Sequence, residues 1–534
     1  MKKIIILTGA IWFFNQTFAG GLLTIGNQSA QYIRMLSRNA STSIDAVYYN
    51  PAGLMLMDNG FYISVHNQSI FQTKSIESGF PLLNNSKFEG KLAMPIFPSA
   101  FAVYKKEKFA LSLGFGPNGG GASGEFGNGL PSFDKSISTL PVKLSGLNKI
   151  GMKVDGYSSD FYFKGESHNW GMQGGASVKI NNVFSVYGGL RYVLAKSRYQ
   201  GHLSNIAVRV NGEFKNAAAF LGTEVPGILH GMSAQATGAA VSVQPLILLG
   251  GGGYTLAQVQ RFNYISLEQR TALEQGLIKL AGKTQSEVDQ MSVSAIQATF
   301  NAGAAAINGQ ADIMTATAGQ LHDKLVESSQ TGAGITPIIG LDIKPIENLN
   351  IGIKYEFMTK MTLTNKTKVD DTGLFTDAKK TVRDIPAIFS VGADYKISKL
   401  TLSGSFNHYY DKGVDWGMNI YNEPRVIDHN AWEVAVGTQY QLTNILAVSC
   451  GYLRTSMGVY PQFQSDFSYY NNVINSFGGG FEIKLTPNFN VDAGAIVSNA
   501  KDATKPFVDR TYGNYSETYS KHNLGFALGL GYKF

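Results

Sequence analysis

The chain ends with the sequence LGFALGLGYKF, from Leu524 to Phe534, and this stretch decides the fold. Its large apolar residues occupy every second position, with glycine, alanine and lysine between them. Successive side chains of a β-strand point to opposite faces, so all the large apolar side chains share one face. A strand with one apolar face and one small or polar face suits the wall of a transmembrane β-barrel, which meets lipid outside and a polar lumen inside.

Both ends of the chain carry export signals. The terminal Phe534 resembles the C-terminal signal of bacterial outer-membrane proteins, which implies the barrel-assembly machinery and outer-membrane lipid as partners. Residues 1–19 combine Lys2 and Lys3, an apolar stretch and a small-residue end, which is the order of a secretory signal peptide. We expect cleavage after Ala19, and no cysteine lies there to carry a lipoprotein anchor.

The composition favours one large β structure. The 534 residues include 60 Gly, 26 Tyr and 32 Phe, and only 16% are charged. The mean hydropathy of −0.05 suits a wall that is apolar on one face, and no stretch predicts a transmembrane helix. The formal charge of +7 comes without a Lys/Arg cluster, so no nucleic-acid partner is expected.

The alternating segments predict an all-β fold, a transmembrane antiparallel barrel of about 14 strands over residues 60–534. Short links such as 105–108, 181–182 and 398–399 alternate with long ones, and the short set should face the periplasm. In the strand that begins at Leu349, Lys354 and Glu356 fall on the polar parity and belong in the lumen. The long links, which should lie outside the cell, cover residues 73–90, 118–165, 195–333, 410–430, 456–474 and 498–519.

Residues 20–59 are too irregular to form a strand of the barrel wall. They contain the run ASTSIDAVYYNPAGL, residues 40–54, directly before the first strand. A small-residue run, an Asp-Ala pair and Asn-Pro-Ala in this position resemble the FadL-type family of long-chain fatty acid and hydrocarbon transporters. The resemblance extends to the architecture of the whole mature chain.

That resemblance implies a fourteen-stranded barrel whose residues 20–59 fold into the lumen as a hatch. Asn50, Pro51 and Ala52 would then lie at the hatch tip, beside a kink in the third strand where substrate leaves sideways. Proline fixes φ and asparagine caps turns, so the tripeptide suits a rigid plug. The alternative interpretation is an ordinary tight turn before a strand.

The third strand carries its own breaking signals. Gly114, Gly116 and Pro117 follow or interrupt its alternating residues, and glycine and proline weaken ladder pairing. We expect a bend here that opens the wall to the bilayer. Equally, residues 117–131 could be an outer loop.

The insertion at 205–333 predicts a partly helical extracellular loop. Helical spacing runs from Leu267 to Leu280, from Ser286 to Phe300 and around 313–326. Ahead of these helices, Leu246, Ile247, Leu248 and Leu249 form an apolar run that either captures ligand or forms the core of the loop. The glycines that follow lack the βαβ context of a nucleotide site.

Nothing in the sequence predicts catalysis or a cofactor. The eight histidines are dispersed and no metal or nucleophile motif stands out. The lone Cys450 excludes a disulfide framework and has the parity of a lipid-facing residue. A barrel hydrolase, with a Ser/His/Asn site assembled across strands, is kept as a minor alternative.

The sequence hypothesis is therefore passive uptake of a hydrophobic small molecule across the bacterial outer membrane. The resemblance implies long-chain fatty acids first and aromatic hydrocarbons next. For a carboxylate ligand, a luminal Lys354 or Arg191 could pair with the head group. A hydrophilic porin and a surface adhesin are the alternatives; residues 20–59 speak against the first and the insertion leaves the second open.

Overall fold

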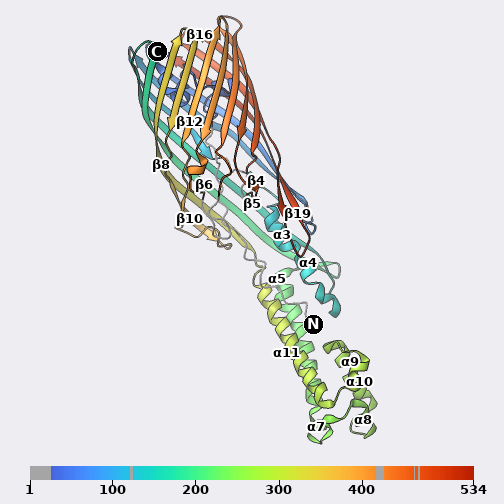
Figure 1. The fold of residues 1–534 in the computed structure, drawn as a ribbon. Helices are drawn as coiled ribbons and strands as arrows, with labels where there is room; N and C mark the ends of the chain where they lie inside the picture. Colours follow the sequence, from blue (N-terminus) through green and yellow to red (C-terminus); the bar gives the residue numbers. More distant parts are fainter. Residues whose placement is uncertain (1–25, 121–123, 417–425, 462–463, 467–468) are drawn as a thin grey trace. The chain divides into compact units, whose positions relative to one another are not determined.

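The computed structural model describes residues 26–120, 124–416, 426–461, 464–466 and 469–534. The chain divides into two compact units (Figure 1). In the described part, residues 26–135, 161–203 and 324–534 form a β-barrel with short helical segments, while residues 136–160 and 204–323 form a mainly helical unit.

The barrel is a closed antiparallel sheet with fourteen wall strands. β1 pairs with both β2 and β19, which closes the sheet. Four wall strands each consist of two successive pieces, namely β3 and β4, β9 and β10, β11 and β12, and β17 and β18. The two pieces of such a strand pair, one after the other, with the same adjacent wall strand. The bounds are β1 (Gly60–Ser78), β2 (Lys87–Lys106), β3 (Phe109–Gly120), β4 (Gly124–Phe126), β5 (Val154–Lys179), β6 (Phe184–Val210), β8 (Lys324–Ile346), β9 (Leu349–Glu356), β10 (Thr362–Asp370), β11 (Lys380–Val382), β12 (Ile388–Ile397), β13 (Leu400–Tyr409), β14 (Trp432–Gln441), β15 (Leu446–Ser456), β16 (Val473–Thr486), β17 (Phe489–Ala500), β18 (Ala503–Phe507) and β19 (Tyr515–Lys533).

The alternation predicted for the last strand is confirmed. Leu528 is 53% exposed on the outer face of β19, whereas the neighbouring Ala527 is 6% exposed. Lys354 and Glu356 of β9 are buried on the inner face, as their parity predicted. Cys450 is a free thiol exposed on the outer face. The outer surface is therefore the apolar one, which is the arrangement of a membrane-spanning wall.

Several strands are longer than the alternation predicted. β6 was expected to end at Leu194 and continues to Val210, and β8 begins at Lys324 instead of Ile335. A barrel strand crosses the bilayer in about 9–11 residues, so the outer face beyond the lipid has no need of apolar side chains. The ladder continues there while the apolar pattern that reveals it stops.

The longer part of the helical unit lies between β6 and β8 in sequence. The ladder between β6 and β8 ends where Leu203 meets Lys324, and the last residues of β6 pair with β7 (Glu213–Asn216). Its core consists of apolar side chains from six helices, α6 to α11. The helix predicted from Leu267 is α9, which Ser266 caps and Gly282 ends. The single helix predicted over 286–300 is instead α10 and α11, because Ser292 caps a new helix. The bounds are β7 (Glu213–Asn216), α3 (Pro131–Ser138), α4 (Leu140–Lys143), η2 (Ser145–Ile150), α5 (Ala217–Ala219), η3 (Phe220–Glu224), α6 (Val225–Ser242), α7 (Gln244–Leu248), η4 (Gly251–Gly253), α8 (Leu256–Arg261), α9 (Leu267–Ala281), α10 (Gln285–Gln290), α11 (Val293–Ala318) and, in the barrel unit, η5 (Asp411–Gly413).

Residues 26–59, called the N-terminal segment below, lie inside the barrel. They form α1 (Ala30–Met35), α2 (Ala46–Tyr49) and η1 (Pro51–Leu56). α1 contacts β1, β14, β15, β16, β17 and β19, and every residue from 28 to 41 is buried. A Cβ on Gly451 or Gly478 would overlap backbone oxygens of α1, so glycine on the inner wall makes room for this helix. Within the described ranges, the chain has no helix that is both long and apolar enough to cross a membrane.

A charge on the outer face of β19 tests the assignment of lipid and lumen faces. We expect Leu528→Arg to lower the free energy of unfolding in lipid vesicles by about 2–4 kcal/mol if the side chain lies near the bilayer midplane. The control is Val508→Arg, at an exposed position between β18 and β19, which should have little effect. Equal effects of the two substitutions would contradict the assignment.

Candidate functional site

An internal ion pair holds the N-terminal segment together. The fully buried carboxylate of Asp45 accepts hydrogen bonds from Arg38 Nε (2.9 Å) and Nη2 (2.7 Å). Ser41 and Ser29 also donate to it, at 2.7 and 3.1 Å. Burial alone would raise the pKa of Asp45, but the Arg38 guanidinium and these hydrogen bonds outweigh burial and lower it. The carboxylate therefore stays charged and joins α1, α2 and the link between them.

A second buried ion pair attaches the segment to the wall. Arg34 Nε on α1 donates to Asp492 Oδ1 of β17 at 2.9 Å, and Gln31 Nε2 donates to Asp492 Oδ2 at 2.6 Å. Arg34 also contacts Glu482 at 3.4 Å. Removing one partner of a buried ion pair costs about 3–5 kcal/mol, so α1 is firmly held against β16 and β17.

Asn50, Pro51 and Ala52 are buried where the segment meets β5, β6 and β8. Ser177 donates to the Pro51 carbonyl at 2.6 Å and Ser185 to the Ala52 carbonyl at 2.8 Å. The Asn50 amide donates to Asp342, and Pro51 begins η1, a position where its missing N–H is not needed. The tripeptide is therefore a wall contact and the start of a helix, with its groups bonded to neighbouring strands.

The wall is interrupted between β2 and β3. The two strands pair up to Ala100 and Phe115, and pairing resumes only where Lys91 meets Glu125 of β4. Within the described residues, no ladder pair joins β2 to residues 116–120, although β3 stays paired with β5 and shifts register after Pro117. Proline has no N–H to donate, and both edges carry one here, Pro98 and Pro117.

Aromatic side chains meet across this gap. Trp170 of β5 stacks on Phe115 of β3, with ring centroids 5.3 Å apart, and also contacts Phe97 of β2 at 5.5 Å. β3 lies between β2 and β5 in the sheet. Side chains of β2 and β5 meet here because β3 is no longer paired with β2. We call residues 97–100, 115–120 and Trp170 the wall gap.

The N-terminal segment covers the wall gap from inside. Gln28 Nε2 donates to the Pro117 carbonyl of β3, and Ser99 of β2 donates to the Gln28 carbonyl, so one residue bridges both edges. A Cβ on Gly116 would overlap Gln28, and a Cβ on Gly114 would press against Val47. The structure thus brings Gly114, Gly116 and Pro117 together with the segment at a closed gap.

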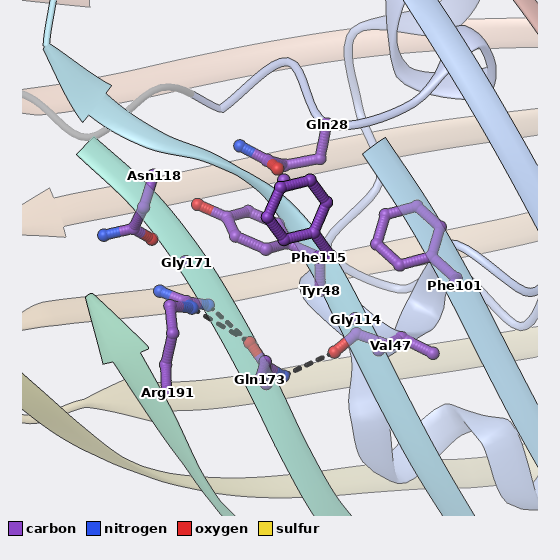
Figure 2. A pocket seen from close by; sticks show the side chains of 11 residues that line it. Gln28, Val47, Tyr48, Phe101, Gly114, Phe115, Asn118, Gly171, Gln173 and Arg191 are labelled. Atoms are coloured by element: carbon purple, nitrogen blue, oxygen red, sulfur yellow. Dashed lines mark hydrogen bonds between the residues drawn. The ribbon is translucent and has the colours of Figure 1, made fainter. Parts of the chain in front are cut away.

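A small cavity lies at this junction (Figure 2). Gln28, Val47 and Tyr48 line it from the segment, opposite Gly114 and the other wall residues. Gln173 donates to the Val47 carbonyl at 2.6 Å and accepts from Arg191. The wall residues that line the cavity are Phe101, Gly114, Phe115, Gly116, Asn118, Gly171, Gln173 and Arg191.

The two cations expected to bind a carboxylate ligand already have a carboxylate. Arg191 Nη1 lies 2.5 Å from Glu356 Oε2, and Lys354 Nζ lies 2.7 Å from Glu356 Oε1. Lys354 also donates to the Tyr48 carbonyl at 2.7 Å, and both cations lie over the Tyr48 ring. The group therefore carries a surplus of one positive charge, and its evident role is to hold α2 against the wall.

A second cavity lies in the barrel unit near the long connections. Phe133, Phe163, Val326, Leu374 and Phe375 give it an apolar lining, and the other lining residues are Gly201, His202, Leu203, Lys324 and Thr372. It is larger and more apolar than the cavity at the wall gap, so it suits the uncharged part of a ligand.

The four apolar residues selected in the insertion have different environments. Leu246 is buried in the core of the helical unit and Ile247 packs against that core. Leu248 and Leu249 are exposed, by 77% and 70%. Leu246 thus fits the interpretation as a loop core, and only the last two residues present an apolar surface to solvent.

Sequence reasoning did not find Gln28, Arg34, Asp45 or Trp170. Isolated polar residues in an irregular segment have no local signal, and their partners lie far along the chain. The only available signal was negative: two Gln and two Arg lie in a segment that is too apolar and too rich in small residues to be a solvated tail. Among the described residues, no group of His, Cys, Asp and Glu could hold a metal ion.

The Asp45 ion pair yields a stability prediction. In Asp45→Asn, Arg38 is left as a buried cation without its carboxylate, and we expect the segment to lose about 3–5 kcal/mol of local stability. Hydrogen–deuterium exchange of residues 26–59 measures this loss. The control is Asp58→Asn, which breaks an exposed pair with Lys533.

The same contact predicts a pH dependence. Because the pKa of Asp45 is lowered on folding, its stabilisation is present above the ordinary carboxyl value of about 3.9 and is lost as the pH falls through the folded value. Exchange of the segment should therefore stay slow at neutral pH and rise only in acid. Equally slow exchange in wild type and Asp45→Asn would contradict both expectations.

Solved structures with the same fold are transport proteins. A FadL homologue of Pseudomonas aeruginosa has a TM-score of 0.55 and 13% identity, over 97% of this chain and 100% of that chain. The Pseudomonas putida toluene transporter TodX has a TM-score of 0.51 and 11% identity, over 96% and 100%. A scan against protein-family models and a search of curated proteins both find no match. The predicted fold is confirmed: the chain has the closed fourteen-stranded barrel with internal helical segments of FadL-type transporters.

Proposed function

We propose that the protein is a channel of the bacterial outer membrane for passive uptake of hydrophobic small molecules. The observation that carries this proposal is the wall gap between β2 and β3, closed from inside by the N-terminal segment. The structures of the same fold support it, since one is a FadL homologue and the other a toluene transporter. Long-chain fatty acids are the leading substrate class and aromatic hydrocarbons come next.

Capture begins at the apolar cavity lined by Phe163, Leu374 and Phe375. Burial of apolar surface is favourable by about 25 cal/mol per Å², so this cavity draws an apolar chain out of water. Lys324 and His202 in the lining suit a carboxylate at its mouth. The exposed Leu248 and Leu249 are a further candidate surface for first contact.

The N-terminal segment acts as a hatch, and only part of it needs to move. The bridge through Gln28 consists of two hydrogen bonds, each worth about 0.5–1.5 kcal/mol net. The buried pairs of Arg34 and Asp45 cost several times more to break. Displacement therefore starts at Gln28 and Val47, while α1 stays attached to β17.

Release is lateral. A solute that is apolar has no favourable path through an aqueous pore, whereas the wall gap leads from the lumen directly into lipid. Movement of Gln28 and Val47 away from Gly114 and Gly116 would join the inner cavity to that gap. The gradient of ligand between the outside and the membrane drives the transfer.

The filled lumen argues against the hydrophilic porin. Residues 28–41 are all buried, so the N-terminal segment fills the part of the lumen at the level of α1. No observation favours a surface adhesin or a hydrolase over uptake.

A reversible lock on the hatch tests this proposal. A Cβ at position 114 would lie 3.0 Å from Val47 Cγ1, which is compatible with the Cβ separation of about 3.5–4.5 Å in a disulfide. In a Cys450→Ser background, we expect oxidised Val47→Cys/Gly114→Cys to lose most oleate uptake into proteoliposomes. Reduction should restore it.

The two single-cysteine variants, oxidised in the same way, are the matched controls and should transport oleate in both states. Uptake of a small sugar, measured in parallel, should be absent in every variant. Oleate uptake by the disulfide-locked form at the rate of the reduced form would refute hatch movement at the wall gap, and sugar uptake would make the protein a porin.

A further inference from the structure

Two lysines face each other inside the barrel, away from the wall gap. Lys74 of β1 and Lys521 of β19 are direct cross-strand partners. Lys74 is only 9% exposed and shares the inward parity of β1, and Lys521 shares the inward parity of β19 with Ala527. The side chains of direct partners start about 4.5–5.5 Å apart, and like charges in this arrangement repel.

The structure describes no carboxylate next to this pair. Among the described residues, neither lysine has an ion pair within 4 Å or a hydrogen bond to an acidic side chain. The inward carboxylate of β19, Glu517, accepts instead from Tyr519 (2.6 Å) and Ser78 (3.3 Å). The Coulombic influence of Lys521 on Lys74 is repulsive.

The contrast with the other luminal cations is clear. Arg34, Arg38, Arg191 and Lys354 each lie within 4 Å of a carboxylate. Burying a charge without a partner is costly. Lys105, at the end of β2, is buried without such a contact but donates to Asn59 and to the Glu107 carbonyl. Lys74 and Lys521 differ because two cations face each other with no acid beside them among the described residues, which makes a site that an external anion would complete.

The surroundings of the pair are apolar on one side and polar on the other. The next inward partners are Ile76 and Tyr519, which belong to a buried cluster with Phe88, Phe126 and Tyr469. Lys74 Nζ lies 5.6 Å from the Tyr469 ring centre. On the other side Gln72 donates to Asn523 at 2.8 Å, and the buried Gln72 Oε1 has no partner. Rotation of this amide would turn its N–H groups toward an anion.

We propose that Lys74 and Lys521 form a binding site for the anionic head group of an amphiphile. A carboxylate, sulfate or phosphate head group lies between the two ammonium groups, and the first part of the apolar tail lies against the aromatic cluster. The amphiphilic ligand is taken from the proposed uptake function, on which this part of the inference rests. The site is separate from Arg191 and Lys354, which share the carboxylate of Glu356.

Ligand binding to protein in phosphatidylcholine nanodiscs tests the site. We expect Lys74→Met/Lys521→Met to bind radiolabelled oleate about tenfold or more weakly, since charge-assisted hydrogen bonds are lost. Binding of oleyl alcohol, which lacks the charge, should not change. Lys74→Arg/Lys521→Arg should retain oleate binding, and Lys91→Met, at an exposed residue of β2, is the matched control.

Unchanged oleate binding in the double methionine variant, or an equal loss for oleyl alcohol, would overturn the site. Inorganic phosphate at millimolar concentration should compete poorly with oleate. Full competition would identify a site for simple anions and overturn the proposal of an amphiphilic ligand. The methionine variant should unfold at the same or a higher temperature because repulsion is removed, and a lower temperature would indicate a structural role instead. If it fails to fold, Lys521→Gln gives the same comparison.

The inference and the proposed function fail in different ways. Loss of the head-group site weakens binding in nanodiscs, where no transport occurs. If the proposed function is wrong, the rate of oleate uptake is the same with and without the Val47–Gly114 disulfide, while oleate still binds.

Discussion

The broken ladder between β2 and β3 is the constraint on which the rest of the account depends. A closed barrel satisfies every backbone group of its wall, and lipid offers no replacement for a missing partner. Pro98 and Pro117 remove donors from the two facing edges, and the Gln28 side chain and carbonyl occupy both edges from inside. The N-terminal segment is therefore bonded to both edges of the gap, to the Pro117 carbonyl on β3 and to the Ser99 hydroxyl on β2.

The lumen shows how firmly each part of the segment is held. α1 is anchored through Arg34 and Asp492, and Arg38 and Asp45 secure α1 to α2. Over the wall gap, Gln28 is held by neutral hydrogen bonds, whereas Val47 contacts Gly114 and adjoins Tyr48, whose carbonyl accepts from the charged Lys354. This gradient of attachment suits local displacement. A barrel that expelled the whole segment would have to separate several buried ion pairs from their partners.

The sequence was sufficient for features that depend on local pattern. Period-two alternation predicted the wall, and Gly114, Gly116 and Pro117 marked the strand that leaves its neighbour. The outer halves of β6 and β8 were missed because their outward faces become polar beyond the lipid, with Lys196 and Arg198 on β6 and Glu327 and Ser329 on β8. Contacts such as Arg34 with Asp492, 458 positions apart, and the register that sets Lys74 opposite Lys521 depend on barrel closure. No local pattern encodes them, and for the same reason the Glu356 partner of Arg191 and Lys354 was not expected.

Capture of the ligand at the outer side of the wall gap tests lateral release most directly. Ile96, an exposed residue of β2 beside the gap, is replaced by a photoreactive amino acid in membrane-embedded protein, with Val436 on β14 as the matched outward position away from the gap. The account predicts that labelled oleate supplied from outside cross-links at position 96 during uptake and not at position 436, and that the Val47–Gly114 disulfide abolishes the signal. Equal labelling at both positions, or labelling at 96 that persists in the locked form, would contradict release through the wall gap.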